Sequence, residues 1–224
     1  MFLFYVRDEL EGYGSDICIY HDKKGNIVSR IQNLTRFLVG LESLIQPHIN
    51  IPVEIEEKLK YIIKGNIKGY KKTLHLNLSA ADRTNFRSYF TRNVPVNILD
   101  KLLNFLKDRD VIVLTTAAPW DKDKFCYLKN KYQTHTNLNF IDTPDLYHLI
   151  GVVKMADLVV TPETSVVHIA SALNKKIVGI YDSEKKFKEW PPWSDEFKVI
   201  LPNIPYVMLS LDFDKLCKEI LKFL

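Results

Sequence analysis

From Thr73 onward, short apolar runs alternate with amphipathic helical patterns, and this alternation limits the chain to very few folds. The runs LHLNL, VIVLT and NFI are typical of strands, and helices are expected at about 97–107, 122–131 and 144–155. Strands that are separated by helices form a parallel sheet with helices on both faces. The sequence therefore predicts an α/β fold.

The stretch from Met155 to Tyr181, MADLVVTPETSVVHIASALNKKIVGIY, is the most informative unit of this alternation. Residues 157–161 predict a buried strand that stops at Pro162, because proline cannot donate to a sheet ladder. A helical pattern begins at Thr164, and Asn174 is suited to the left-handed conformation that ends helices. The unit therefore reads as strand, tight loop, helix and strand.

The loop of this unit is a candidate phosphate site. Glu163, Thr164 and Ser165 lie at the first turn of the predicted helix, where unpaired N–H groups and the helix dipole favour an anion. Ser165 and His168 are three residues apart and lie on one stripe, so both could meet a phosphate or sugar. The alternative is an ordinary βαβ unit with capping hydroxyls and a surface histidine.

Two further loops follow predicted strands, at the edge of the sheet where open α/β proteins bind ligands. After LHLNL come Ser79, Arg83 and Arg87, and guanidinium groups suit a diphosphate. After VIVLT come Thr116 and Asp121, whose oxygens suit a ribose or sugar.

Several classes are excluded by missing motifs. No GxGxxG, GxxxxGK[ST] or GxSxG is present, which argues against a dinucleotide dehydrogenase, a P-loop protein and an α/β-hydrolase. The three cysteines, Cys18, Cys126 and Cys217, form no CxxC pair, so neither a disulfide framework nor a metal site is expected. A hydrophobic content of 46% argues against disorder, and a net charge of +4 is too small to indicate nucleic-acid binding.

The first 70 residues have a different pattern. A strand is expected at Phe2–Val6, a hairpin at Asp16–Arg30, and helices near Thr35–Ile45 and Val53–Ile63. The basic segment Lys64–Lys72 is typical of a linker. We therefore expect an N-terminal part at 1–70 and a sheet domain at 71–205, followed by a C-terminal helix within 206–224.

One helix start is predicted in detail. Thr143 would cap the helix, Pro144 would take its first position, and Asp145 would place a carboxylate at its positive end. The last helix is expected at about 212–223.

From about Lys72 to Ile200, the chain resembles the nucleotide-sugar-binding half of the lipopolysaccharide heptosyltransferases, glycosyltransferase family 9. The segment ADLVVTPETSVVHIASALNKKIVGIY is similar to the family pattern ADLVVTxDTGxxHLAAALxKPVVALF, and the family's W-x-P-W element is matched around Trp190 and Trp193. NLSAADRTNFRSY resembles the family's first donor loop, and places Arg87 at its phosphate-binding Lys and Tyr89 at its Trp.

The resemblance implies a GT-B-like Rossmann domain with a parallel sheet, and metal-independent, inverting transfer of a heptose or related sugar. The donor would be a nucleoside-diphosphate sugar, ADP-linked, with no further cofactor. Thr164 and Ser165 would offer N–H groups to the diphosphate, with Glu163 and His168 beside the sugar. The acceptor would be a lipid-linked saccharide of the lipopolysaccharide core. Of the residues in the matched element, Trp190 and Trp193 are expected to be packing residues rather than sugar platforms.

The chain departs from the family pattern in two ways. Glu163 and Ser165 replace Asp and Gly, and the Cβ of Ser165 limits close backbone approach to a ligand. No strand and Gly-Asp arrangement precedes residue 70, so we expect a small N-terminal α+β remnant of the acceptor half and can assign no catalytic base.

Three functions remain open: a glycosyltransferase, an inactive nucleotide-sugar-binding fragment, and a nucleotide-sugar 2-epimerase of similar architecture. No apolar run reaches the roughly 18 residues of a transmembrane helix, and the N-terminus does not resemble a signal peptide. A cytoplasmic location is expected, with or without peripheral contact at the inner face of the inner membrane.

Overall fold

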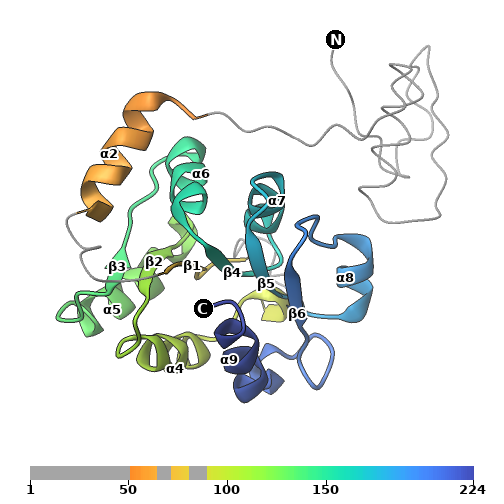
Figure 1. Cartoon of the computed structure of the whole chain (residues 1–224). Coiled ribbons are helices and arrows are strands. Elements are labelled where there is room, and N and C mark those ends of the chain that lie inside the picture. Colours follow the sequence, from red (N-terminus) through yellow and green to blue (C-terminus); the bar gives the residue numbers. More distant parts are fainter. Residues whose placement is uncertain (1–50, 65–71, 81–89) are drawn as a thin grey trace, which may run out of the picture. The chain divides into compact units, whose positions relative to one another are not determined.

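A computed structural model describes residues 51–64, 72–80 and 90–224, and it confirms the predicted α/β fold with a parallel sheet (Figure 1). Six parallel strands lie in the order β3-β2-β1-β4-β5-β6. The strands are β1 (Thr73–Asn77), β2 (Ile112–Thr116), β3 (Leu138–Phe140), β4 (Leu158–Pro162), β5 (Lys176–Ile180) and β6 (Phe197–Ile200). This order reverses between β1 and β4, as in Rossmann folds, and creates a crevice at their carboxyl ends.

Helices cover both faces of the sheet (Figure 1). The helices are α2 (Val53–Lys64), α4 (Val96–Leu106), α5 (Lys122–Lys131), α6 (Leu146–Met155), α7 (Ser165–Ala172), α8 (Glu184–Glu189) and α9 (Phe213–Leu221), with short 3-10 turns η2 (Pro119–Asp121) and η3 (Met208–Ser210). Apolar residues of α4, α5 and α9 pack on one face of the sheet. Those of α2, α6 and α7 pack on the other.

The central strands are buried on both sides because helices cover both faces. In β1, Leu74 and Leu76 join the core formed with α4 and α9, while neighbouring Ile112 and Leu114 of β2 point into the core formed with α2 and α6. All four are at most 1% exposed. A continuous apolar run is therefore the expected pattern for such strands, since no position faces water.

Helix α2 packs against α6 at a position where a glycine permits close approach. A Cβ added to Gly151 would clash with Cδ1 of Leu59. Leu59 is 1% exposed, and Glu56 of α2 pairs with Lys154 of α6 at 2.7 Å. The helix predicted near 53–63 is thus confirmed, and it packs on the sheet domain.

Most predicted helices are confirmed with small shifts at their ends, but one predicted cap is wrong. The N-cap of α6 is Asp145, whose Oδ1 accepts a hydrogen bond from the N–H of His148 at 2.9 Å, so Thr143 and Pro144 precede the helix. An aspartate that reaches the third N–H of the helix displaces the threonine as cap. Asn174, at φ 47°, has the predicted left-handed conformation after α7.

Residues 45–224 form one compact unit. The strand, hairpin and first helix predicted within residues 1–50 lie outside the described residues, as does most of the predicted linker. The division into domains at residue 70 therefore stays a prediction.

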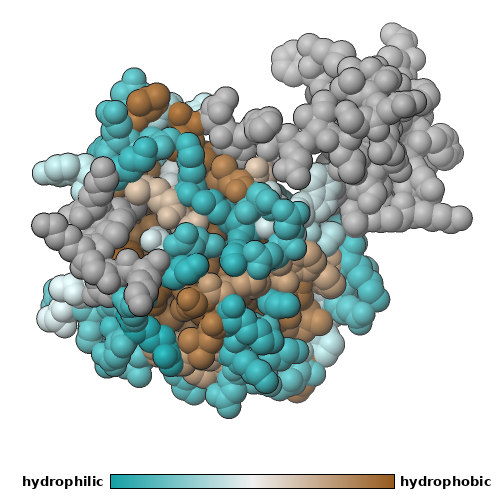
Figure 2. All heavy atoms as spheres, viewed as in Figure 1, coloured by the Kyte–Doolittle hydropathy of each residue, from teal (hydrophilic) through white to brown (hydrophobic). Residues whose placement is uncertain are grey.

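Hydrophilic and apolar residues are interspersed on the face of the molecule in Figure 2. None of the helices in the described ranges combines the length and the apolar character needed to cross a bilayer.

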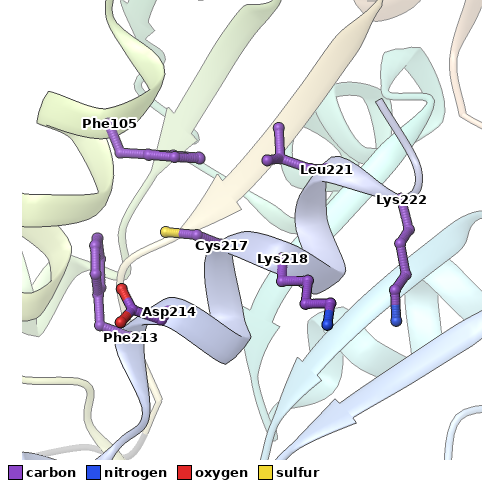
Figure 3. A pocket seen from close by; sticks show the side chains of 7 residues that line it. All are labelled: Phe105, Phe213, Asp214, Cys217, Lys218, Leu221 and Lys222. Atoms are coloured by element: carbon purple, nitrogen blue, oxygen red, sulfur yellow. The ribbon is translucent and has the colours of Figure 1, made fainter.

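A groove of about 490 Å³ lies between α4 and α9, where Phe105, Phe213, Cys217 and Leu221 line it (Figure 3).

Candidate functional site

A cleft of about 460 Å³ lies at the carboxyl ends of β1, β2 and β4, where the strand order reverses. Its volume is within the range of small-molecule sites. Its walls come from the ends of these strands, the loop before α6 and the first turn of α7. The lining residues are Asn77, Ser79, Ala80, Arg92, Thr116, Ala117, Ala118, Pro119, Trp120, Thr143, Pro144, Asp145, Leu146, Leu149, Thr164, Ser165 and Val166.

The N-terminus of α7 opens into this cleft. Thr164 is the N-cap, and its Oγ1 accepts a hydrogen bond from the N–H of Val166 at 3.1 Å. In the described part of the chain, the N–H groups of Thr164 and Ser165 have no protein acceptor. Free N–H groups and the positive end of the helix dipole together favour an anionic ligand here.

Asn77, the last residue of β1, connects the two walls of the crevice. Its Nδ2 donates to Oγ1 of Thr161 at 3.0 Å, to Oγ1 of Thr164 at 3.4 Å and to the carbonyl of Ser79 at 2.9 Å. Its Oδ1 accepts from the N–H of Ser79 at 3.2 Å. One buried amide therefore holds the loop after β1 and the loop after β4 together.

Ser79 and Thr116 both lie in the cleft wall, where they also support the structure. The Oγ of Ser79 accepts from the N–H of Ala118 at 2.9 Å, which fixes the loop after β2. The Oγ1 of Thr116 lies 2.8 Å from Nε2 of the fully buried His75. Burial lowers the pKa of His75 to about 3, so this imidazole is neutral under the wall of the cleft.

Arg92 and Glu163 form an ion pair beside the first turn of α7. The Nη2 of Arg92 lies 2.7 Å from Oε2 of Glu163 and donates to its carbonyl at 2.5 Å. Glu163 is 8% exposed, and burial raises the pKa of its carboxyl, although the neighbouring charges of Arg92 and Lys186 oppose the shift. Arg92 lines the cleft, whereas Glu163 does not.

His168 lies one turn into α7 and does not line the cleft. Its ring packs edge to face on Trp190 with centroids 5.7 Å apart, and burial lowers its pKa. The Tyr181 hydroxyl donates to the carbonyl of Trp190 at 2.7 Å. Trp190 therefore packs in the structure as expected, whereas Trp193 is 37% exposed. A sugar contact by His168 stays a prediction.

The structure brings four of the predicted site residues together and does not do so for the others. Ser79, Thr116, Thr164 and Ser165 all lie at the cleft, as the loop argument required. Arg87 lies outside the described residues, together with Arg83 and Tyr89. Asp121 is fully buried and lies 3.2 Å from Nζ of Lys124, so it does not reach a ribose in this cleft.

Sequence reasoning missed two residues at this site. Asn77 lies inside the predicted strand LHLNL, and the one available signal is a polar side chain close to the carboxyl end of an apolar run. Arg92 precedes Pro95, the N-cap of α4, and nothing in the sequence pairs it with Glu163, 71 positions away.

The far end of the cleft lies near the start of α6. Asp145 accepts from both the N–H and Nδ1 of His148, and these hydrogen bonds lower the pKa of its carboxyl. A smaller hollow of about 200 Å³ adjoins this end and shares Pro119 and Thr143 with the cleft. Among the described residues, no three His, Cys, Asp or Glu side chains are grouped to hold a metal ion.

A doubly wound parallel sheet with a helix N-terminus at the switch point defines a Rossmann-like α/β domain. The family model for glycosyltransferase family 9 (heptosyltransferase) matches residues 88–217, which is more than half of the chain. The protein belongs to glycosyltransferase family 9. No curated protein matches the sequence.

Solved structures share this fold at low sequence identity. ADP-heptose lipopolysaccharide heptosyltransferase II of E. coli is 15% identical with a TM-score of 0.68, covering 89% of this chain and 62% of its own. A family 9 glycosyltransferase of Veillonella parvula is 12% identical with a TM-score of 0.75, covering 92% and 62%. E. coli heptosyltransferase WaaC, solved with ADP, is 14% identical with a TM-score of 0.65, covering 93% and 60%. This chain thus spans about 60% of the length of these enzymes.

Proposed function

We propose that the cleft binds a nucleoside-diphosphate sugar and that the protein transfers heptose or a related sugar to a lipopolysaccharide or lipooligosaccharide core. The observation that carries the proposal is the N-terminus of α7, which opens into the cleft and where the N–H groups of Thr164 and Ser165 have no acceptor among the described residues. Family membership supports it, as do heptosyltransferase structures solved with ADP and with ADP-2-deoxy-2-fluoro heptose.

The diphosphate would lie at the α7 end of the cleft. Its oxygens would accept from the amides of Thr164 and Ser165 and from the hydroxyl of Ser79, while Arg92 would supply the positive charge. The nucleoside would then extend toward Thr143 and Pro144, where the adjoining hollow adds space. The base is proposed to be adenine, as in the heptosyltransferase complexes.

In the transfer step, an acceptor hydroxyl would attack the anomeric carbon, and the bond to the diphosphate oxygen would break with inversion. Negative charge develops on the leaving diphosphate, where the α7 amides and Arg92 would stabilise it. The hydroxyl proton would pass to a carboxylate base, which cannot be assigned among the described residues.

A second function, sugar-nucleotide binding without turnover, is favoured by one observation. Among the described residues that line the cleft, Asp145 is the one carboxylate, and it caps α6. Because the hydrogen bonds from His148 lower its pKa, Asp145 is a poor proton acceptor. A base would have to come from elsewhere in the chain or from a partner.

Calorimetric titration with ADP, UDP and GDP tests the binding proposal, because it examines the site and the base together. We expect micromolar to millimolar affinity, tightest for ADP. Failure of all three nucleotides to bind would overturn the proposal.

Turnover with ADP-heptose and a core oligosaccharide then separates the two functions. Product formation supports the transferase, whereas nucleotide binding with no product supports the binding module. Release of a free epimerised sugar would instead indicate an epimerase.

A further inference from the structure

We propose that Glu163 acts in this cleft through Arg92, as a positioning residue, instead of contacting the donor sugar. The inference rests on the proposed function, because it concerns how the cleft presents positive charge to a diphosphate. It also gives a specific role to the glutamate that replaces the aspartate of the family pattern.

The contacts of Arg92 support this role. One guanidinium nitrogen, Nη2, is held by two acceptors of the same residue, the Glu163 carboxylate at 2.7 Å and its carbonyl at 2.5 Å. Glu163 directly precedes Thr164, the N-cap of α7. The pair therefore fixes the segment before α4 to the loop that presents the α7 amides.

The two side chains differ in what they can reach. Arg92 lines the cleft and its side chain is 25% exposed, whereas the Glu163 side chain is 10% exposed and does not line the cleft. A guanidinium group has five N–H donors, and Glu163 occupies one nitrogen of Arg92. The Nε of Arg92 is enclosed and makes no hydrogen bond among the described residues. The exposed part of the guanidinium group is therefore what Arg92 presents to a phosphate in the cleft.

The charges around Glu163 explain why the pair would stay together. Burial raises the pKa of this carboxyl, the charges of Asp182 and Glu189 raise it further, and Arg92 and Lys186 lower it. A buried carboxylate is costly without a partner, and Arg92 is the partner in contact. Moving Glu163 to a sugar would break this pair.

The two roles for Glu163 predict different responses to ligands. A positioning residue affects the diphosphate site, so replacing it weakens ADP and ADP-glucose equally. A sugar contact affects only the ligand that carries a sugar. A positioning residue also has no further effect once Arg92 is removed, because its influence passes through that side chain.

The experiment is calorimetric titration of the full chain with ADP and ADP-glucose. The variants are Glu163→Ala, Arg92→Ala, the double variant and Glu163→Gln. We expect Glu163→Ala to weaken both ligands about tenfold, Arg92→Ala to weaken both by at least as much, and the double variant to match Arg92→Ala. Glu163→Gln keeps an oxygen acceptor for Arg92 and should stay within about threefold of the unaltered chain.

Two results would overturn the inference alone: a Glu163→Ala variant that loses affinity only for ADP-glucose, or effects that add in the double variant. Failure of the unaltered chain to bind either ligand would overturn the proposed function as well, so the two failures are distinguishable. Thermal melts check the folding of each variant. If Glu163→Ala does not fold, the comparison of ADP with ADP-glucose is made on Glu163→Gln, where a loss confined to ADP-glucose contradicts the inference.

Discussion

Two hollows of similar volume lie in different parts of the domain, and they differ in chemistry. The cleft at the strand ends measures about 460 Å³ and presents hydroxyls, an arginine and the first-turn amides of α7, which have no acceptor among the described residues. The groove between α4 and α9 measures about 490 Å³ and is lined by side chains alone: Phe105, Phe213, Asp214, Cys217, Lys218, Leu221 and Lys222 (Figure 3). Volume therefore does not distinguish a ligand site here.

The difference comes from the positions of the two hollows relative to the strands. At the carboxyl ends of the strands, the chain must turn from strand to helix, and each turn leaves N–H groups without partners. Between α4 and α9 the backbone is already hydrogen-bonded within helices, so only side chains face the groove. We therefore expect nucleotides to bind at the cleft and not in the groove.

The largest expected effect comes from blocking each hollow with the same side chain. Ser165→Trp places an indole at the exposed first turn of α7 and should weaken ADP binding by more than about a hundredfold, because it occludes the cleft. The matched control, Leu221→Trp in the groove, should leave ADP affinity unchanged. Calorimetry measures both, and a reversed pattern would place the site in the groove.

The free energy of unfolding should depend on pH through His75, the buried histidine beneath the cleft. The pKa of His75 is about 3 in the folded protein and 6.5 when unfolded, so between these values only the unfolded state binds the proton. The contribution of His75 to the free energy of unfolding is therefore fully present above pH 6.5 and decreases as the pH falls below that value. The folded-to-unfolded ratio should drop by up to roughly tenfold per pH unit.

Chemical denaturation from pH 7 to pH 4.5 measures this slope. His75→Gln should flatten it, whereas His135→Gln, at a partly exposed site between α5 and β3, should not. An unchanged slope in His75→Gln would show that His75 does not titrate in this way.

The smallest effect concerns two thiols, one in the groove and one in the smaller hollow beside the cleft. Burial raises the pKa of Cys217 in the groove to about 11, while Cys126 is exposed in the hollow that adjoins the cleft. The thiolate of Cys217 should be scarce at pH 7.5, and its greater nucleophilicity offsets only part of that deficit. Iodoacetamide should therefore modify Cys217 about tenfold more slowly than Cys126, by peptide mass spectrometry. Equal rates would show that the groove is more open than its lining indicates.

Much of the fold could be predicted from the sequence because it follows from local patterns. The apolar runs of β1, β2 and β4 and the helical spacing in α4 and α5 need no knowledge of the tertiary structure. Helix α8 and strand β6 were not predicted. Strand β6 is an edge strand with a partly exposed, mixed pattern, and α8 has no buried residue, so neither has a clear periodic signal.

For the candidate site, the sequence predicts which loops follow the strands, but not how these loops contact one another. Thr164 and Ser165 could be identified because a helix start is a local feature. The partnership of Arg92 with Glu163 could not, since it depends on how two loops meet across the crevice. The cap of α6 was misassigned because Thr143 and Asp145 are both good caps, and backbone geometry selects the second.

The side-chain amide of Asn77 links both walls of the crevice through one nitrogen. Since a single nitrogen is shared by the loops after β1 and β4, the spacing of the two walls is set by the length of one side chain. The loops cannot drift independently, and a change at this one position would alter the fit of a ligand on both sides at once. Divergence of ligand preference in such a domain can thus begin at a residue that the ligand need not contact.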